Sequence, residues 1–141
     1  MNIQDLQKRA EEIINSYCNE YNLQPVNIKV KNLKTSGRVR YKTRFISIPL
    51  WAYEGGGIYY FTAYILHELT HLILHDKGVY DGHGKQFRFL ETQLLKEHDM
   101  VPLQYKKSFY YRLEDINGNL LWVASEKKRK EIGLRSYNLT R

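Results

Sequence analysis

Cysteine is almost missing from this chain of 141 residues, and its scarcity excludes two classes of small protein. Cys18 is the one cysteine, so the chain can form neither an internal disulfide nor a cysteine-based zinc finger. An unpaired thiol suits a reducing compartment. The first residues also lack a basic start followed by an apolar stretch, so no signal peptide is predicted and we expect an intracellular protein.

Long hydrophobic runs are missing as well. No uninterrupted apolar run approaches the roughly 20 residues that cross a membrane, so we expect no membrane partner. Hydrophobic residues still make up 43% of the sequence, which is enough for the core of one domain of this length.

Acidic residues are absent between Glu20 and Glu54, although the same stretch is rich in basic ones. Its basic residues are Lys29, Lys31, Lys34, Arg38, Arg40, Lys42 and Arg44. A purely solvated face normally mixes both signs of charge, and the net charge of +7 favours an acidic partner. We therefore expect a nucleic-acid-facing patch, and a merely solvated outer face is the alternative. The predicted contacts are Lys29, Lys31, Arg38, Arg40, Lys42 and Arg44.

Apolar spacing predicts an α+β fold. Period-two alternation predicts three short strands, which we expect to form a small antiparallel sheet. Helical spacing predicts an N-terminal helix with Asn2 as its N-cap, a buried central helix and a third helix. The expected helices span 3–21, 58–75 and 84–98, and the expected strands span 26–31, 38–42 and 44–48.

Glycines and a late turn complete the predicted layout. Gly55, Gly56 and Gly57 predict a flexible loop, which is no phosphate-binding loop because the Lys-Ser/Thr pair is missing. The Asn117-Gly118 pair predicts a hairpin over 109–124. We expect one domain over 1–124 and a basic tail over 125–141.

The central helix carries the pattern H-E-x-x-H, from His67 to His71. Residues four apart lie on one face of a helix, so two imidazoles can close on one zinc ion. Glu68 lies beside them, where it can accept a proton from water. A hydrogen-bonded core is the alternative reading of these polar residues.

A catalytic zinc site needs a third protein ligand, and the sequence offers three residues for it. His75 is excluded, because eight helical residues place it about 12 Å from His67 whereas a Zn–N bond is about 2.1 Å. His83 follows a glycine-flanked loop that can fold back over the helix, and it is our prediction. Glu91 on the next helix is the alternative ligand; otherwise it is a helix-surface charge or a partner behind a ligand.

These motifs, taken together, resemble the SprT-like (Spartan-type) zinc metallopeptidases over about residues 5 to 100. The resemblance rests on the basic segment from Ser36 to Tyr41, on the H-E-x-x-H helix, and on the later sequence from Gly82 to Phe87. It implies a zincin-like fold, one Zn²⁺ held by His67, His71 and His83, and Glu68 as the catalytic base. It also implies proteolysis of DNA-bound or DNA-crosslinked proteins, as in DNA repair. Many members carry a cysteine-rich zinc ribbon after this core, where this chain has the cysteine-free hairpin.

Two other functions fit parts of the pattern. A zinc-dependent nuclease would use three histidines and a basic sheet, but Glu68 has no role in it. A non-catalytic nucleic-acid-binding module would use zinc only as a structural element. The sequence does not identify the protein substrate or the oligomeric state.

Overall fold

The computed structural model describes residues 1–102 and 111–124, which form three helices and two small sheets around one core. The predicted basic tail over 125–141 and residues 109 and 110 of the predicted hairpin lie outside the described residues. The helices are α1 (Ile3–Glu20), α2 (Trp51–Asp76) and α3 (Lys85–Lys96). The strands are β1 (Asn27–Lys31), β2 (Arg38–Arg40), β3 (Phe45–Pro49), β4 (Met100–Pro102), β5 (Tyr111–Asp115) and β6 (Leu120–Ala124).

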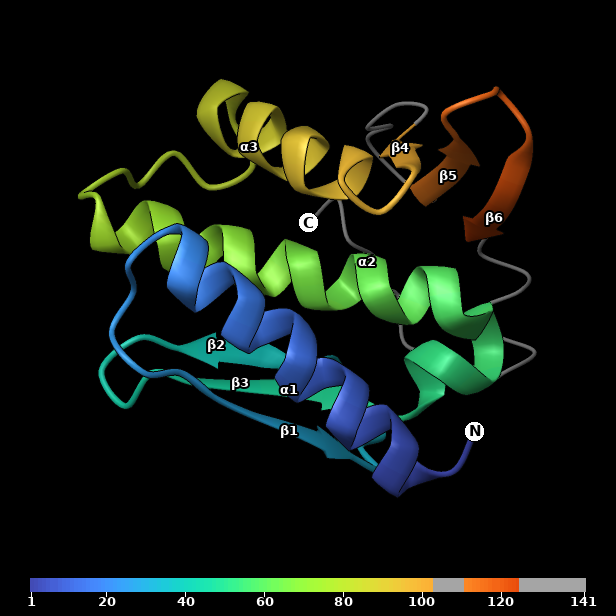
Figure 1. Cartoon of the computed structure of the whole chain (residues 1–141), viewed down its shortest axis with the longest axis horizontal. Coiled ribbons are helices and arrows are strands. Elements are labelled where there is room, and N and C mark those ends of the chain that lie inside the picture. The colour runs from blue at the N-terminus through green and yellow to red at the C-terminus, as the bar shows by residue number, and fades with distance from the viewer. Residues whose placement is uncertain (103–110, 125–141) are drawn as a thin grey trace.

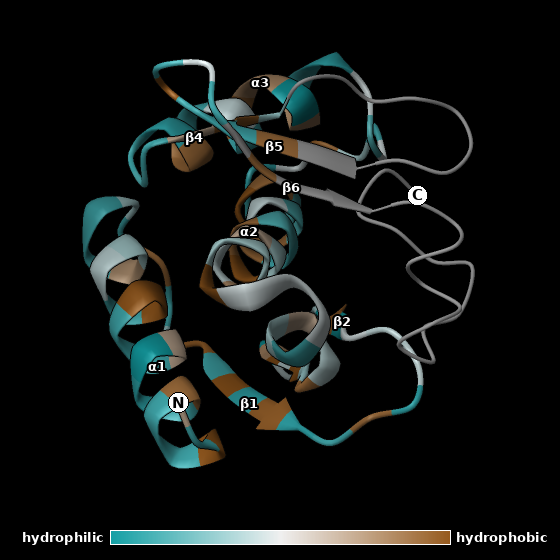
Figure 2. Cartoon of the chain, turned by 90° about the vertical axis from the view of Figure 1, so that its right-hand side faces the viewer, coloured by the Kyte–Doolittle hydropathy of each residue, from teal (hydrophilic) through white to brown (hydrophobic). Residues whose placement is uncertain are grey.

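Helix α2 is the centre of the molecule. Figure 1 shows it between α1 and the first sheet on one side and α3 and the second sheet on the other. Figure 2 looks along it and shows the other elements arranged around it. Every residue from Tyr60 to Thr70 is buried, because apolar side chains lie on nearly every side of this segment. No helix in the described part of the chain is both long and apolar enough to span a membrane.

The glycine-rich segment before this helix is not the loop that the sequence predicts. Residues 51–56 are already helical, and the single departure is at Gly57, with φ 72° and ψ −171°. A side chain would be strained at that angle. At Gly56 a Cβ atom would lie 2.5 Å from Cβ of Tyr60. Glycine therefore allows two helical segments to join at a sharp bend.

The first sheet is mixed, so the prediction of an antiparallel sheet is wrong for one of its two pairings. Its strand order is β1-β3-β2, with β1 parallel to β3 and β2 antiparallel to β3. The chain crosses from β1 to the far edge before it turns back, and β3 therefore fills the gap between the two. The second sheet, β4-β5-β6, is antiparallel, and Pro102 ends its edge strand β4.

Helix α1 closes the outer edge of β1 with one side chain. Its predicted N-cap is confirmed, since Asn2 and Asp5 form a reciprocal capping box. On the buried side, Gln7 donates from Nε2 to the carbonyl oxygen of Ile28 at 2.8 Å and accepts from the N–H of Val30 at 2.8 Å. The Gln7 amide thus occupies the position that a neighbouring strand would take.

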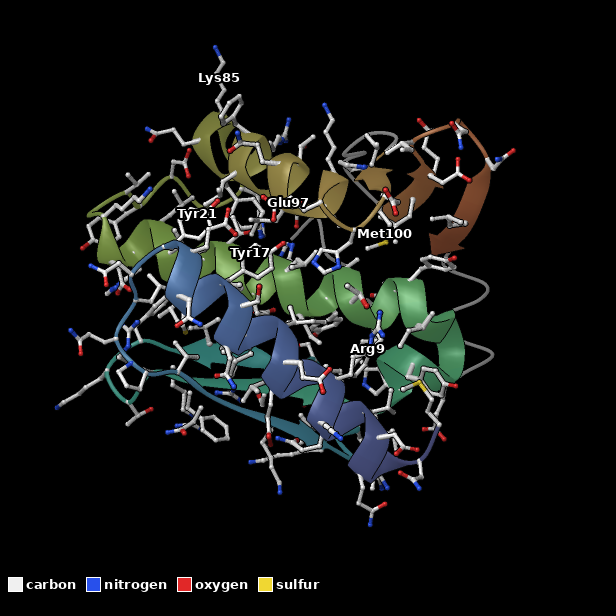
Figure 3. The ribbon with its side chains drawn as sticks, in the orientation of Figure 1. Arg9, Tyr17, Tyr21, Lys85, Glu97 and Met100 are labelled. Carbon is white, nitrogen blue, oxygen red and sulfur yellow. The ribbon has the colours of Figure 1, made fainter. Side chains whose placement is uncertain are left out.

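A second polar contact joins α1 to the end of α3. The Tyr17 hydroxyl donates to Oε2 of Glu97 at 2.7 Å, and Figure 3 shows the two side chains from their separate helices. Nε2 of His98 lies 3.1 Å from the same hydroxyl. Burial and the Glu97 carboxylate raise the pKa of Tyr17. These contacts fix α1 and α3 on opposite flanks of α2.

Candidate metal centre

Two of the predicted ligands lie on the buried middle of α2. His67 and His71 are one helical turn apart, and their rings meet edge to face with centroids 5.0 Å apart. His67 is 3% exposed and Glu68, the next residue, is 9% exposed. The apolar sequence around them holds the backbone in a helix, so the spacing of the motif becomes a fixed geometry.

The loop between α2 and α3 brings His83 to the same place. Gly82 has φ +61°, which turns the chain back over α2. Asp81 anchors the loop to α3, because its Oδ2 accepts from the N–H of Gln86 at 3.0 Å and its carbonyl accepts from Gly84 at 2.9 Å. Nε of Arg88 donates to the carbonyl of His83 at 3.0 Å, which fixes the histidine itself.

The three histidines converge through their Nε2 atoms. Nε2 of His83 lies 3.2 Å from Nε2 of His71 and 3.3 Å from Nε2 of His67. One nitrogen from each ring can be chosen so that all three lie within 4.8 Å of one another. Ligands on a tetrahedral ion with bonds of about 2.1 Å are separated by about 3.4 Å. The three residues could therefore hold one metal ion.

Electrostatics also favours a cation between these rings. Burial lowers the pKa of His67 to about 3. Burial, then the neighbouring histidines, lower the pKa of His71 to about 3. Burial, then the neighbouring His67, lower the pKa of His83 to about 4. Neutral imidazoles that face one another through ring nitrogens bring lone pairs together, and a metal ion satisfies them.

Glu91 supports His67 from behind, so the structure excludes a surface role for it. It is fully buried in α3, and its Oε2 lies 2.6 Å from Nδ1 of His67. In the tautomer that carries its hydrogen on Nδ1, His67 donates to Glu91 and directs the Nε2 lone pair at the other two rings. Oε1 of Glu91 is buried without a hydrogen-bond partner in the described part of the chain. Burial raises the pKa of this carboxyl group.

Replacing Glu91 with leucine should weaken zinc binding by about 10- to 100-fold while the apolar core holds the fold. Leucine removes the acceptor that sets the His67 tautomer, whereas Glu91→Gln retains an acceptor oxygen and should lose less. Competition with a chelator measures both affinities. The matched control is Gln93→Leu on the exposed side of the same helix. Equal zinc affinity in Glu91→Leu and Gln93→Leu would contradict this role.

Phe87 is a packing residue of the site that the sequence identified only as part of a motif. It is completely buried, and its ring centroid lies 4.9 Å from His67, 4.4 Å from His71 and 4.9 Å from His83. One aromatic ring therefore contacts all three imidazoles and limits their rotation. The signal in the sequence was its place in the pattern His-Gly-x-x-Phe, which begins at His83 just before α3.

Glu68 is positioned for proton transfer. Its carboxyl group is buried beside His67, and burial raises its pKa to about 8, with a further contribution from the Glu91 charge. A buried carboxylate with a raised pKa accepts and returns a proton readily near neutral pH. Within the described chain, His75 stays apart from the metal cluster and stacks on Tyr41, with centroids 4.1 Å apart.

Four of the six predicted nucleic-acid contacts share the outer face of the first sheet. Lys29 and Arg38 both pair with Ser47, Arg40 pairs with Phe45, and paired residues point to the same face. Lys31 lies on this face too, with Nζ 5.1 Å from the Phe45 ring centroid. The side chains are exposed, whereas Ile28, Val30 and Ile46 face the helices.

The remaining two predicted contacts differ. Lys42 is exposed in the turn between β2 and β3. Arg44 does not belong to the patch, because it forms a bidentate ion pair with Asp76 at 2.8 and 2.9 Å. It also donates to the carbonyls of Gln24 and Pro25. Arg44 therefore fastens the end of α2 to the chain before β1.

Comparison with known proteins adds little to this picture. No family model matches the chain, and no curated protein matches it. Among solved structures it is similar to the metallopeptidase zymogen abylysin of Pyrococcus abyssi, with 24% identity and a TM-score of 0.41, over 70% of this chain and 89% of that one. A likeness at this TM-score supports no conclusion about function, which has to be inferred from the site itself.

Proposed function

We propose that this protein is a zinc-dependent endopeptidase of the SprT-like type. The observation that carries the proposal is the convergence of three Nε2 atoms beside a buried glutamate. His67, His71 and His83 would hold the metal, and His83 rather than Glu91 would be the third ligand, because the Glu91 carboxylate faces Nδ1 of His67. Three protein ligands leave an open coordination position, which distinguishes catalytic from structural zinc sites.

A zinc ion in this site would supply Lewis acidity that lowers the pKa of water and polarises a carbonyl group. Glu68 carries the proton. It accepts a proton from the attacking water, whose oxygen forms a bond to the carbonyl carbon of the scissile peptide. It then returns that proton to the amide nitrogen as the carbon–nitrogen bond breaks. The second proton of the water passes from the new carboxylic acid to the amine, so one water is consumed and a carboxylate and an ammonium group are released.

Glu91 and Phe87 would act through the ligands. Glu91 holds one tautomer of His67, and Phe87 packs against all three rings. A site whose ligands cannot rotate loses less conformational entropy on binding zinc and holds the open position in a constant direction.

We propose further that the substrate is a protein bound to DNA. The support is the basic outer face of the first sheet, which carries Lys29, Lys31, Arg38 and Arg40. Two ion pairs of the described residues are Arg44–Asp76 and His67–Glu91, and neither involves these four side chains. Uncompensated cations on one face attract a polyanion.

Reversing two of these charges should weaken DNA binding. In the double variant Arg38→Glu and Arg40→Glu, the slope of log affinity against log salt should flatten by about 0.9 for each DNA phosphate that the protein no longer neutralises. The control is Lys85→Glu with Lys96→Glu on α3, which changes the net charge equally on another element. Fluorescence anisotropy over a salt series measures the difference. Equal slopes in both double variants would contradict a DNA-facing patch on the sheet.

One experiment separates the peptidase from its alternatives. Zinc content is measured, and zinc-loaded and chelated proteins are then incubated with casein, with a DNA-bound protein, and with labelled RNA and DNA. Zinc-dependent protein cleavage supports the proposal, and DNA-stimulated cleavage supports its DNA-directed part. Cleavage of nucleic acid alone would instead indicate a nuclease, for which the basic sheet face is the favourable observation. No hydrolysis, with unfolding on zinc removal, would indicate a binding module with structural zinc.

A further inference from the structure

Tyr41 lies where the edge strand β2 ends, against the helix that carries the two histidines. Its ring stacks face to face on His75, with centroids 4.1 Å apart and planes 11° apart. His75 is one helical turn beyond His71, so the stack places Tyr41 along the histidine-bearing face of α2. The ring is therefore held in one orientation although the residue is 37% exposed.

The same tyrosine forms one wall of a cavity that is also lined by His71, one of the three proposed metal ligands. The cavity has a volume of about 240 Å³, and its walls include Tyr41, His71, His75 and Gly82. Gly82 precedes His83 in the loop between α2 and α3, so this loop forms one side of the cavity. A substrate that occupies this space would lie against a predicted metal ligand and the Tyr41 side chain together.

The charge around Tyr41 favours a neutral phenol. Burial, and then the charge of Glu68, raise the pKa of the Tyr41 hydroxyl. The hydroxyl therefore keeps its hydrogen at neutral pH, within the electrostatic influence of the proposed catalytic base. Among the described residues no hydrogen bond involves this hydroxyl, and a phenol can donate one hydrogen bond to a substrate.

Other tyrosines near the centre are less suitable. The Tyr64 hydroxyl accepts from the N–H of Gly37 at 2.8 Å and is almost fully buried. Tyr80 borders the same cavity, but it is 74% exposed and meets His75 only edge to face. Among the tyrosines that the structure describes, Tyr41 alone combines an ordered ring, a wall of the cavity and the charge of Glu68.

We propose that the Tyr41 hydroxyl donates a hydrogen bond to the carbonyl oxygen of the scissile peptide as negative charge develops on that oxygen. The inference rests on the peptidase function proposed above and names a catalytic residue for it. The tyrosine gains and loses no proton. Its contribution is a fixed donor directed at the tetrahedral species, and such donors stabilise the transition state more than the bound substrate.

The test is Tyr41→Phe, which keeps the ring on His75 and removes only the hydroxyl. With casein as substrate, kcat should fall about 100-fold while KM changes by less than about twofold. A second readout is binding of a phosphinic analogue of the mapped cleavage-site peptide, measured by calorimetry on the zinc-loaded protein. Its affinity should fall by a similar factor, whereas affinity for the product peptide should not change. Tyr59→Phe is the matched control, because Tyr59 is exposed on α2 and does not line this cavity, and it should behave as wild type.

The outcomes are distinguishable. If zinc-loaded wild type does not hydrolyse casein, the peptidase function itself fails. If wild type is active and Tyr41→Phe matches it in kcat and in phosphinic-peptide affinity, the function stands and the role of Tyr41 is overturned. A loss confined to KM would also overturn it, because it would assign Tyr41 to ground-state binding. An unchanged melting temperature in both variants excludes a folding defect as the cause.

Discussion

Replacing Glu68 with glutamine should abolish proteolysis while leaving zinc bound. Glutamine has nearly the same shape but cannot accept the proton of the attacking water, so kcat should fall by about 10³-fold or more. Glu68 lies outside the converging histidine nitrogens, so the zinc content should stay at that of wild type. Initial rates on casein, with metal analysis of the same sample, measure both quantities.

The control for this change is Glu54→Gln, in the first turn of the same helix, where the side chain is exposed. It makes the same chemical change away from the site and should alter neither activity nor zinc content. Full activity in Glu68→Gln would rule out the proposed proton carrier. Loss of zinc in that variant would mean that Glu68 also holds the metal.

Replacing His83 with alanine should weaken zinc binding by more than about 100-fold and remove the activity. The loss should exceed that of a residue which only supports a ligand, for which 10- to 100-fold is typical. Two histidines on one helix leave a catalytic zinc site without its third protein ligand, and His83 in the loop before α3 is the residue that we propose for it. Competition with a chelator gives the affinity.

His75→Ala is the matched control for zinc affinity, because His75 continues the same series along α2 but stacks on Tyr41 instead of joining the cluster. Its zinc affinity should equal that of wild type. The Glu91 variants test whether Glu91, instead of His83, is the third ligand. If His83→Ala keeps its zinc and Glu91→Gln loses it, Glu91 is the third ligand and the proposed ligand set is wrong.

The sequence predicts the parts of this fold that depend on local spacing. The buried middle of α2 follows from an apolar run, and the separation of His67 and His71 follows from helical geometry. Asn2 caps α1 because its side chain can reach the free backbone N–H groups of the first turn. The turn at Asn117-Gly118 joins β5 and β6, with φ +87° at Gly118, as a hairpin requires. Each feature is set within a few residues.

The sequence does not predict features that depend on contacts between distant segments. The contact of Glu91 with His67 joins residues 24 positions apart, and nothing near Glu91 in the sequence shows its burial. Arg44 resembles the other basic residues of its stretch, but Asp76, 32 positions later, neutralises it. The parallel pairing of β1 with β3 depends on where the intervening chain crosses, which strand alternation does not encode. Tertiary packing decides all three.

Gln7 gives the first sheet two unequal ends. One amide side chain takes the place of a strand along the middle of β1, whereas β2 at the opposite edge pairs only with β3 in the described chain. Growth of a fibre by edge-to-edge addition needs two open edges on every subunit. With one edge closed, addition of a strand at β2 through this sheet ends at a pair. By blocking one edge of the sheet, Gln7 therefore prevents open-ended aggregation through this sheet.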